Sequence, residues 1–246
     1  MKIFYHIGKY LLFLKKVFKR PQKRNIFIQN IFFEIEKLGI NSIIIVFIIS
    51  VFMGAVITLQ TAYNIEVSFV PLYLVGLGTR DSMFLEFSST IVALILAGKV
   101  GANIASEIGT MKIREQIEAL DIMGVNSESY LVLPKIIAAV FSFPLLTLFS
   151  MFVGIFGGYI AVWLTGAIPI DDFVYGLHYY FVPFYITYSV IKMTVFAFII
   201  ATVPAYQAYF IRGGALEVGR ANTKAVVYSS VLVLFFNVVI TQILLS

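Results

Sequence analysis

The stretch INSIIIVFIISVFMGAVITL, residues 40–59, decides the fold class because it runs for twenty residues without a charged side chain. A helix rises about 1.5 Å per residue, so roughly twenty apolar residues cross the ~30 Å hydrocarbon core of a bilayer. The whole chain shares this character, since 60% of its 246 residues are hydrophobic and only 13% are charged. A water-soluble fold cannot bury that much apolar side chain. We therefore expect a membrane protein.

Four more stretches outward from this one are long and apolar enough to cross: residues 82–105, 136–164, 193–211 and 225–245. The first of them carries Glu86 and Lys99 near its ends, where long side chains can reach the interface. Residues 136–164 exceed one crossing, so tilt or a bend at Pro144 is expected to take up the excess. The predicted fold class is all-α: a polytopic membrane protein with five transmembrane helices.

Positive charge gathers on one side of this five-span arrangement. Nine of the 18 Lys and Arg residues precede Leu38, and sixteen lie in segments that alternate crossings place on the same side, which leaves Arg80 and Lys192. Cytoplasmic flanks collect Lys and Arg, so we expect a cytoplasmic N-terminus and a C-terminus on the far side. The net charge of +5 then indicates contact with membrane lipids, and no nucleic-acid partner.

The sequence gives little support for a catalytic site or a metal site. The chain has no cysteine and only two histidines, His6 and His178, which excludes thiolate sites and makes a histidine metal centre unexpected. No base stands beside a nucleophile in a recognisable pattern, and no G-x-x-x-x-G-K-[ST] loop occurs. We expect a chain that is no enzyme and binds no cofactor itself. If ATP drives it, a second polypeptide must bind the ATP.

Region 1–38 is predicted to begin with an amphipathic helix lying in the membrane surface. Its basic residues occupy faces other than the apolar one, and Pro21 is placed to end the helix. The apolar residues at helical spacing are Ile3, Phe4, Ile7, Leu11, Leu14 and Phe18. A solvated basic tail is the alternative. We treat region 1–38 and the bundle of residues 39–246 as a single domain.

The loop of residues 107–135 is the most organised charged segment of the chain. Ile113, Ile117, Leu120 and Met123 fall at i, i+4, i+7 and i+10, and Gly124 stands where a helix would stop. The charged residues Arg114, Glu115, Glu118 and Asp121 point elsewhere. This pattern predicts an amphipathic helix of about three turns, too short to cross a bilayer. Its apolar stripe needs a partner, either the protein's own helix ends or a groove on a soluble subunit.

Two blocks of sequence carry a resemblance to a known family. The first is AGKVGANIASEIGTM, residues 97–111, which continues to Val125, and the second joins RGGA, residues 212–215, to VGRANTKAVV, residues 218–227. Shorter matches are Gly54 with Leu59-Gln60 and the pair Ile191-Lys192. These blocks resemble the MlaE/YrbE-type permeases, the membrane subunits of ABC systems that work with MCE-domain proteins.

The resemblance implies a homodimer in a bacterial inner membrane, with cytoplasmic ABC ATPase subunits on one side and an MCE-domain (MlaD-like) protein on the other. The cargo would be lipid, usually phospholipid. It also implies that residues 115–125 form the coupling helix seated on the ATPase, and that the N-terminal helix is the elbow helix. The chain departs from the family where residues 85–89 read Leu-Glu-Phe-Ser-Ser in place of Arg-Glu-Leu-Gly-Pro, and where Asn237 replaces a common aspartate.

Four polar residues within the spans are candidates for a lipid path: Gln60, Glu86, Lys192 and Asn237. Glu86 either contacts a head group or satisfies a neighbouring helix end or cation at the interface. Lys192 pairs with an acid such as Glu86 or Asp172, reaches a lipid phosphate, or extends toward the interface. Polar side chains are otherwise few, so acyl chains suit the interior better than ions or sugars.

Small residues are expected to let the helices pack closely. Gly154 and Gly158 form a G-x-x-x-G spacing, and Gly98 and Gly101 belong to a small-residue face. Two other functions remain open for the bundle as a whole. One is an ion-coupled secondary transporter, which would need several intramembrane acids, and the other is a membrane scaffold that moves nothing.

Overall fold

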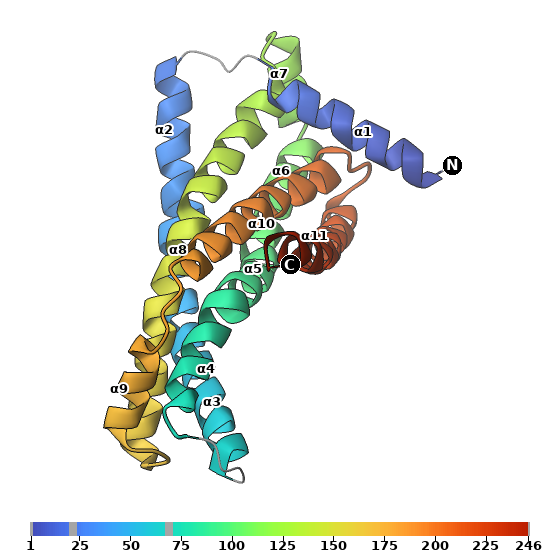
Figure 1. The fold of residues 1–246 in the computed structure, drawn as a ribbon. Helices are drawn as coiled ribbons and strands as arrows, with labels where there is room; N and C mark the ends of the chain where they lie inside the picture. Colours follow the sequence, from blue (N-terminus) through green and yellow to red (C-terminus); the bar gives the residue numbers. More distant parts are fainter. Residues whose placement is uncertain (1, 20–23, 67–70, 246) are drawn as a thin grey trace. The chain divides into compact units, whose positions relative to one another are not determined.

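The computed structural model describes residues 2–19, 24–66 and 71–245, and within them it contains helices and no strand (Figure 1). The α-helices are α1 Lys2–Val17, α2 Arg24–Glu34, α3 Ile43–Glu66, α4 Leu74–Ser82, α5 Val92–Leu96, α6 Ala102–Ile113, α7 Gln116–Ile122, α8 Ser127–Thr165, α9 Ile170–His178, α10 Phe184–Tyr209 and α11 Ala215–Leu245. Between some of them lie π-helical segments, η1 Ile35–Gly39, η3 Met83–Ile91 and η4 Ala97–Gly101, and the 3-10 turn η2 Ile40–Ser42. The all-α prediction is confirmed.

Counted over the described residues, five helical runs are long and apolar enough to cross a membrane. They are Arg24–Ile65, Leu74–Ile113, Ser127–Thr165, Phe184–Tyr209 and Ala215–Leu245. Four of them include a predicted span, and Phe184–Tyr209 covers all but the last two residues of the predicted span 193–211, so the five-span prediction is confirmed. A continuous helix satisfies its own N–H and C=O groups, which lipid cannot do. The first three runs hold 42, 40 and 39 residues, about twice what one crossing requires.

Contacts divide the chain into two compact units, each described here by itself. Unit 1 comprises Met1–Asn41, Ala93–Ser142 and Thr194–Ile243, and unit 2 comprises Ser42–Val92, Phe143–Met193 and Leu244–Ser246. Helices α8 and α10 each contribute one part to unit 1 and the other part to unit 2.

In unit 1, helix α1 packs one face against α10 (Figure 1). Phe13 is 2% exposed and its ring meets those of Tyr206, Tyr209 and Phe210. The Tyr10 hydroxyl lies 2.6 Å from the Thr202 hydroxyl.

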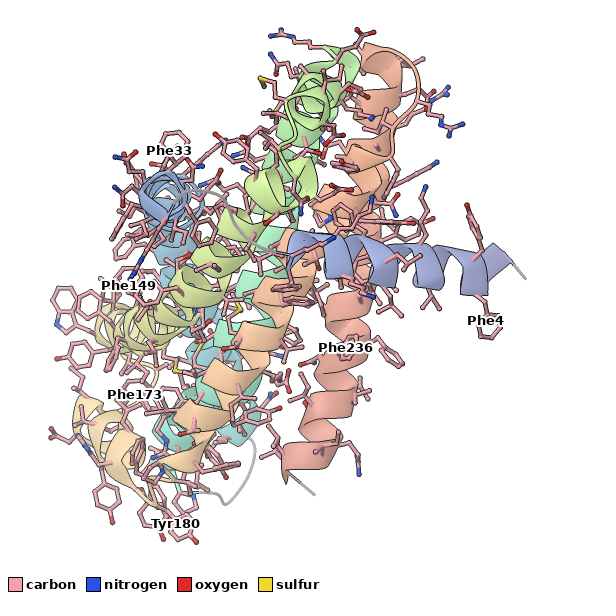
Figure 2. All side chains as sticks on the ribbon, turned by 90° about the horizontal axis from the view of Figure 1, so that it is seen from above. Phe4, Phe33, Phe149, Phe173, Tyr180 and Phe236 are labelled. Atoms are coloured by element: carbon pink, nitrogen blue, oxygen red, sulfur yellow. The ribbon has the colours of Figure 1, made fainter. Side chains whose placement is uncertain are left out.

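The opposite face of α1 carries most of the predicted apolar stripe and is exposed. Phe4 is 81% exposed, Leu11 58% and Phe18 56%, and Figure 2 shows Phe4 projecting from the helix. The expected amphipathic helix is therefore present. Pro21, expected to end it, lies outside the described residues.

A charge cluster ties α2, η1, α6 and α8 together in unit 1. Lys135 is 2% exposed and donates hydrogen bonds to Glu34 and to Glu107, the second over 2.9 Å between Nζ and Oε2. Lys37 donates to the same oxygen of Glu107 over 2.6 Å. The two ammonium groups and two carboxylates offset one another's charge, which the cost of desolvation requires.

In unit 2, glycines bring α3 against the second part of α8. A Cβ on Gly54 would overlap the carbonyl group of Gly154, and one on Gly158 would overlap the Thr58 hydroxyl. Ser50 donates a hydrogen bond of 2.8 Å to Ser150 across the same contact. The predicted close packing at Gly154 and Gly158 is confirmed.

The two glycines of the other predicted pair, Gly98 and Gly101, differ in how closely they are packed. In unit 1 a Cβ on Gly101 would lie 3.2 Å from Cγ of Pro204, which is a tight contact between helical segments. At Gly98 no atom within the described residues lies within 4 Å of the position a Cβ would take. The expectation of close packing therefore holds at Gly101 and is wrong at Gly98 within this chain.

Candidate functional site

Glu86 and Lys192 form an ion pair in unit 2. The Lys192 ammonium donates to Oε1 of Glu86 over 2.9 Å, and the Thr90 hydroxyl donates to Oε2 over 3.0 Å. Glu86 lies in the π-helical segment η3 one turn before Thr90, which places both on the same side of that segment. Wide π turns occur often at functional sites. Of the two acids considered as partners for Lys192, Glu86 is the one that the fold supplies.

Lys192 is held on every side. Its side chain is fully buried, and the ammonium also donates to the carbonyl oxygen of Leu85 over 3.1 Å and to the Tyr188 hydroxyl over 3.0 Å. An ammonium group has three N–H donors, so Leu85, Glu86 and Tyr188 occupy all of them. The expectation that Lys192 reaches a lipid phosphate or extends toward the interface is wrong, because this geometry turns it inward.

Glu86 is the open member of the pair. Its side chain is 41% exposed, whereas that of Lys192 is 0% exposed. In the chain Glu86 lies between Phe84 and Phe87, which belong to an apolar cluster with Ile57, Met83 and Met151. The fold thus leaves the carboxylate of Glu86 partly exposed and keeps the matching cation behind it.

The other two lipid-path candidates do not join this pair in the structure. Gln60 shares unit 2 with Glu86, and its side chain is exposed on α3. Asn237 is half-buried on α11 and belongs to unit 1.

Arg80 is a buried, fully hydrogen-bonded cation to which the sequence analysis gave no role. It is 2% exposed, and its guanidinium donates to Asp81 and to the carbonyl oxygens of Leu177, Tyr179 and Tyr180. These bonds hold the chain that leaves α9, where Tyr180 has a φ of 44° and projects outward (Figure 2). The sequence did carry a signal for Arg80. Arg80 and Lys192 are the two cations that lie outside the segments where the other sixteen Lys and Arg residues gather, and both are buried.

The predicted three-turn helix of the loop is wrong in its length. Helix α6 ends at Ile113, Glu115 takes a left-handed φ of 57°, and α7 covers only Gln116–Ile122. Left-handed backbone is disfavoured for a residue with a Cβ and ends a helix. Arg114 and Glu115, both exposed, therefore form the corner between two helices.

The faces of α7 also differ from the prediction. Ile117 is 1% exposed and Leu120 is half-buried, so both contact this chain. Ile122 is 88% exposed and Met123 is 68% exposed. The spacing pattern missed Ile122 because it assumed one continuous helix from Ile113. The exposed apolar tip of α7 is therefore Ile122 with Met123.

Hydrogen bonds fasten both ends of α7 within unit 1. Lys112 donates to Glu118, and this bond holds the pKa of the Glu118 carboxyl below its ordinary value. At the other end the Ser127 hydroxyl donates to Asp121 over 2.5 Å and lies 2.8 Å from the Tyr209 hydroxyl. A helix this short is unstable alone in water, so these contacts set its direction.

The loop after α7 is joined to helix α1. Asn126 donates to the carbonyl oxygens of Lys16 over 3.1 Å and of Lys19 over 3.3 Å, and Lys16 pairs with Glu128 over 3.0 Å. The loop after α7 and the end of α1 are therefore fastened to each other. Within the described residues no three His, Cys, Asp or Glu side chains gather to hold a metal ion.

Comparison with known proteins agrees with the resemblance read from residues 97–111 and 212–227. The chain matches the family described as Permease MlaE over residues 31–243. It is similar to a probable ABC transporter permease protein of Rickettsia bellii, with 34% identity over 96% of this chain and 91% of that protein. The matched residues include the Glu86–Lys192 pair and α7.

Two further relatives carry names that mention lipid. The chloroplastic protein trigalactosyldiacylglycerol 1 of Arabidopsis thaliana is 30% identical over 88% of this chain and 61% of that protein. The intermembrane phospholipid transport system permease protein MlaE of Haemophilus influenzae is 26% identical over 86% of this chain and 81% of that protein.

Proposed function

Because the chain belongs to the MlaE family and is a multi-pass membrane permease of an ABC transporter, we propose that its cargo is lipid, in particular phospholipid, carried between two membranes. The observation that carries the proposal is the Glu86–Lys192 pair. It offers a polar head group a carboxylate, while polar side chains are otherwise few in the spans, which suits acyl chains. The name of the Haemophilus influenzae relative supports the same cargo.

The energy comes from a separate ABC ATPase on the cytoplasmic side. The exposed tip of α7, Ile122 and Met123, supports this, because large apolar side chains on a short charged helix fit a groove on a partner protein. Around the tip, Arg114, Glu115, Glu118 and Asp121 provide a polar rim. Ile117 and Leu120 position the helix from behind and do not form the contact itself.

The proposed assembly is a homodimer of this chain in a bacterial inner membrane, with an MCE-domain protein on the periplasmic side. The N-terminus lies in the cytoplasm and the C-terminus in the periplasm. The excess of Lys and Arg on one side of the five spans supports this direction. The exposed apolar face of α1 suits an elbow helix at the cytoplasmic interface.

The test begins with gentle solubilisation of the full complex, followed by reconstitution into liposomes and measurement of ATP-dependent transfer of labelled phospholipid. We expect an ABC ATPase to co-purify with the chain. Ile122→Glu places a charge in the proposed contact and should lower both the retained ATPase and the transfer rate by about tenfold or more. Gln116→Glu, on an exposed position of the same helix, is the matched control and should leave both unchanged.

Three results would contradict the proposal. Purification without any ATPase would remove the energy source, and transfer that proceeds equally without ATP would remove the coupling. Stable ATPase binding with no ATP-dependent lipid movement would instead identify a membrane scaffold.

A further inference from the structure

In unit 2 the basic side chains are buried, whereas the carboxylates described below are at least partly exposed. The Lys and Arg residues of this unit are Arg80 and Lys192, which are 2% and 0% exposed. All three nitrogens of the Arg80 guanidinium bind Asp81 or backbone carbonyl oxygens. All three donors of Lys192 are likewise engaged. Neither cation has a donor to offer to the phosphate of a lipid.

The acids of the same unit lie closer to the surroundings. The side chain of Glu86 is 41% exposed and that of Asp81 is 25% exposed, while Asp171 is exposed and Asp172 half-buried on α9. The side chain of Glu66 lies outside the described residues, and the exposed His178 is neutral in the formal count at pH 7. The formal charge that this unit presents outward at pH 7 is therefore negative.

The arrangement at Glu86 is directional. Lys192 approaches one carboxylate oxygen and Thr90 the other, both from within unit 2. A carboxylate has about four acceptor positions, so an outside donor can be accepted as well. The Lys192 ammonium offsets the charge of the Glu86 carboxylate from behind. The Glu86 carboxylate is therefore a partly exposed hydrogen-bond acceptor whose position is fixed by Lys192 and Thr90.

We propose that Glu86 receives a primary ammonium group, so that the cargo is an aminophospholipid in preference to a lipid with an anionic or a fully methylated head group. This rests on the proposed function, that the cargo is lipid. A primary ammonium donates N–H groups to a carboxylate in a charge-assisted hydrogen bond. A choline head group has no N–H to donate, and the net charge of a phosphatidylglycerol head group is repelled. Lys192 acts here as a positioning residue, since it holds Glu86 and does not touch the lipid.

The experiment uses the full complex in liposomes that contain equal amounts of acyl-labelled phosphatidylethanolamine, phosphatidylglycerol and phosphatidylcholine. Initial rates of ATP-dependent transfer are compared for the three lipids. We expect the ethanolamine lipid to move about tenfold faster than the glycerol lipid, in line with a hydrogen bond to a charged group. Glu86→Gln should bring the three rates within about twofold of one another, because the neutral amide no longer distinguishes the head groups by charge.

Asp171→Asn is the matched control, since it removes one exposed acid from the same unit without touching the pair. It should keep the wild-type preference. A measurement on unaltered protein guards against misfolding of the variant: lipids retained by the purified complex should be enriched in the ethanolamine head group relative to the source membrane.

The outcomes separate the two proposals. If the wild type moves no lipid with ATP, the proposed function fails and this inference fails with it. If it moves all three lipids at equal rates, or the glycerol lipid fastest, the proposed function stands and the inference is overturned. Loss of the preference in Asp171→Asn as well would overturn the specific role of Glu86.

Discussion

Replacement of Lys135 by Met tests whether the charge cluster of unit 1 holds that unit together. Lys135 is 2% exposed and Glu34 is 7% exposed. Oε2 of Glu34 has no hydrogen-bond partner within the described residues. The charge of the Glu34 carboxylate is therefore compensated there by the bond that Lys135 donates to its other oxygen. Lys135→Met leaves a buried carboxylate without its cation. Breaking a buried pair in this way costs about 3–5 kcal/mol.

The assay is thermal unfolding of the purified protein in nanodiscs, followed by circular dichroism. For a chain of this size each kcal/mol moves the midpoint by about 2–4 °C, so a drop of roughly 6–20 °C is expected on combining the two ranges. Lys37→Met is the matched control. Its side chain is 26% exposed and that of its partner Glu107 is 31% exposed, so the loss should stay below about 1 kcal/mol.

A second variant separates charge compensation from packing. Lys135→Met combined with Glu34→Leu replaces the pair by apolar side chains and should recover most of the lost stability, because a buried pair and an apolar replacement are often nearly equivalent. The reasoning is refuted if Lys135→Met and Lys37→Met shift the midpoint equally. It is also refuted if the double variant is less stable than Lys135→Met alone.

Two further predictions concern packing and pH. Gly54→Ala should lose about 1–3 kcal/mol because its Cβ overlaps a facing carbonyl group, whereas Gly98→Ala should lose nothing, and equal midpoints in thermal unfolding would contradict this. The lowered pKa of Glu118 means that its bond to Lys112 stabilises the fold above the unfolded pKa of about 4.3 and that this contribution is lost as the pH falls through the folded pKa. Lys112→Met should therefore flatten the acid limb of a plot of unfolding midpoint against pH, and an unchanged limb would count against the assignment.

Much of the fold was predictable because its signals are local. The run of residues 40–59 and the four later stretches each correspond to a helix, since a segment in lipid must satisfy its own backbone. The family could also be read from residues 97–111 and 212–227. The amphipathic helix α1 followed from the spacing of its apolar residues.

The details of the candidate site were predictable only in part. Glu86 stood out because an acid in an apolar span is unusual, but the inward orientation of Lys192 depends on Leu85 and Tyr188 together. The corner at Glu115 was missed because the spacing of Ile113 and Ile117 suits one helix as well as two. Periodicity reports which residues are apolar and gives no account of a left-handed backbone between them.

The sequence by itself determined the class of the protein, the number of spans and the family, because hydropathy and motif order belong to single segments of chain. The tertiary structure decided which polar groups meet. Lys192 lies 106 residues from Glu86, and Lys135 lies 101 residues from Glu34. Such pairs form only when packing brings distant helices to hydrogen-bond distance, and the same packing decides that Glu86 faces outward while its lysine is buried.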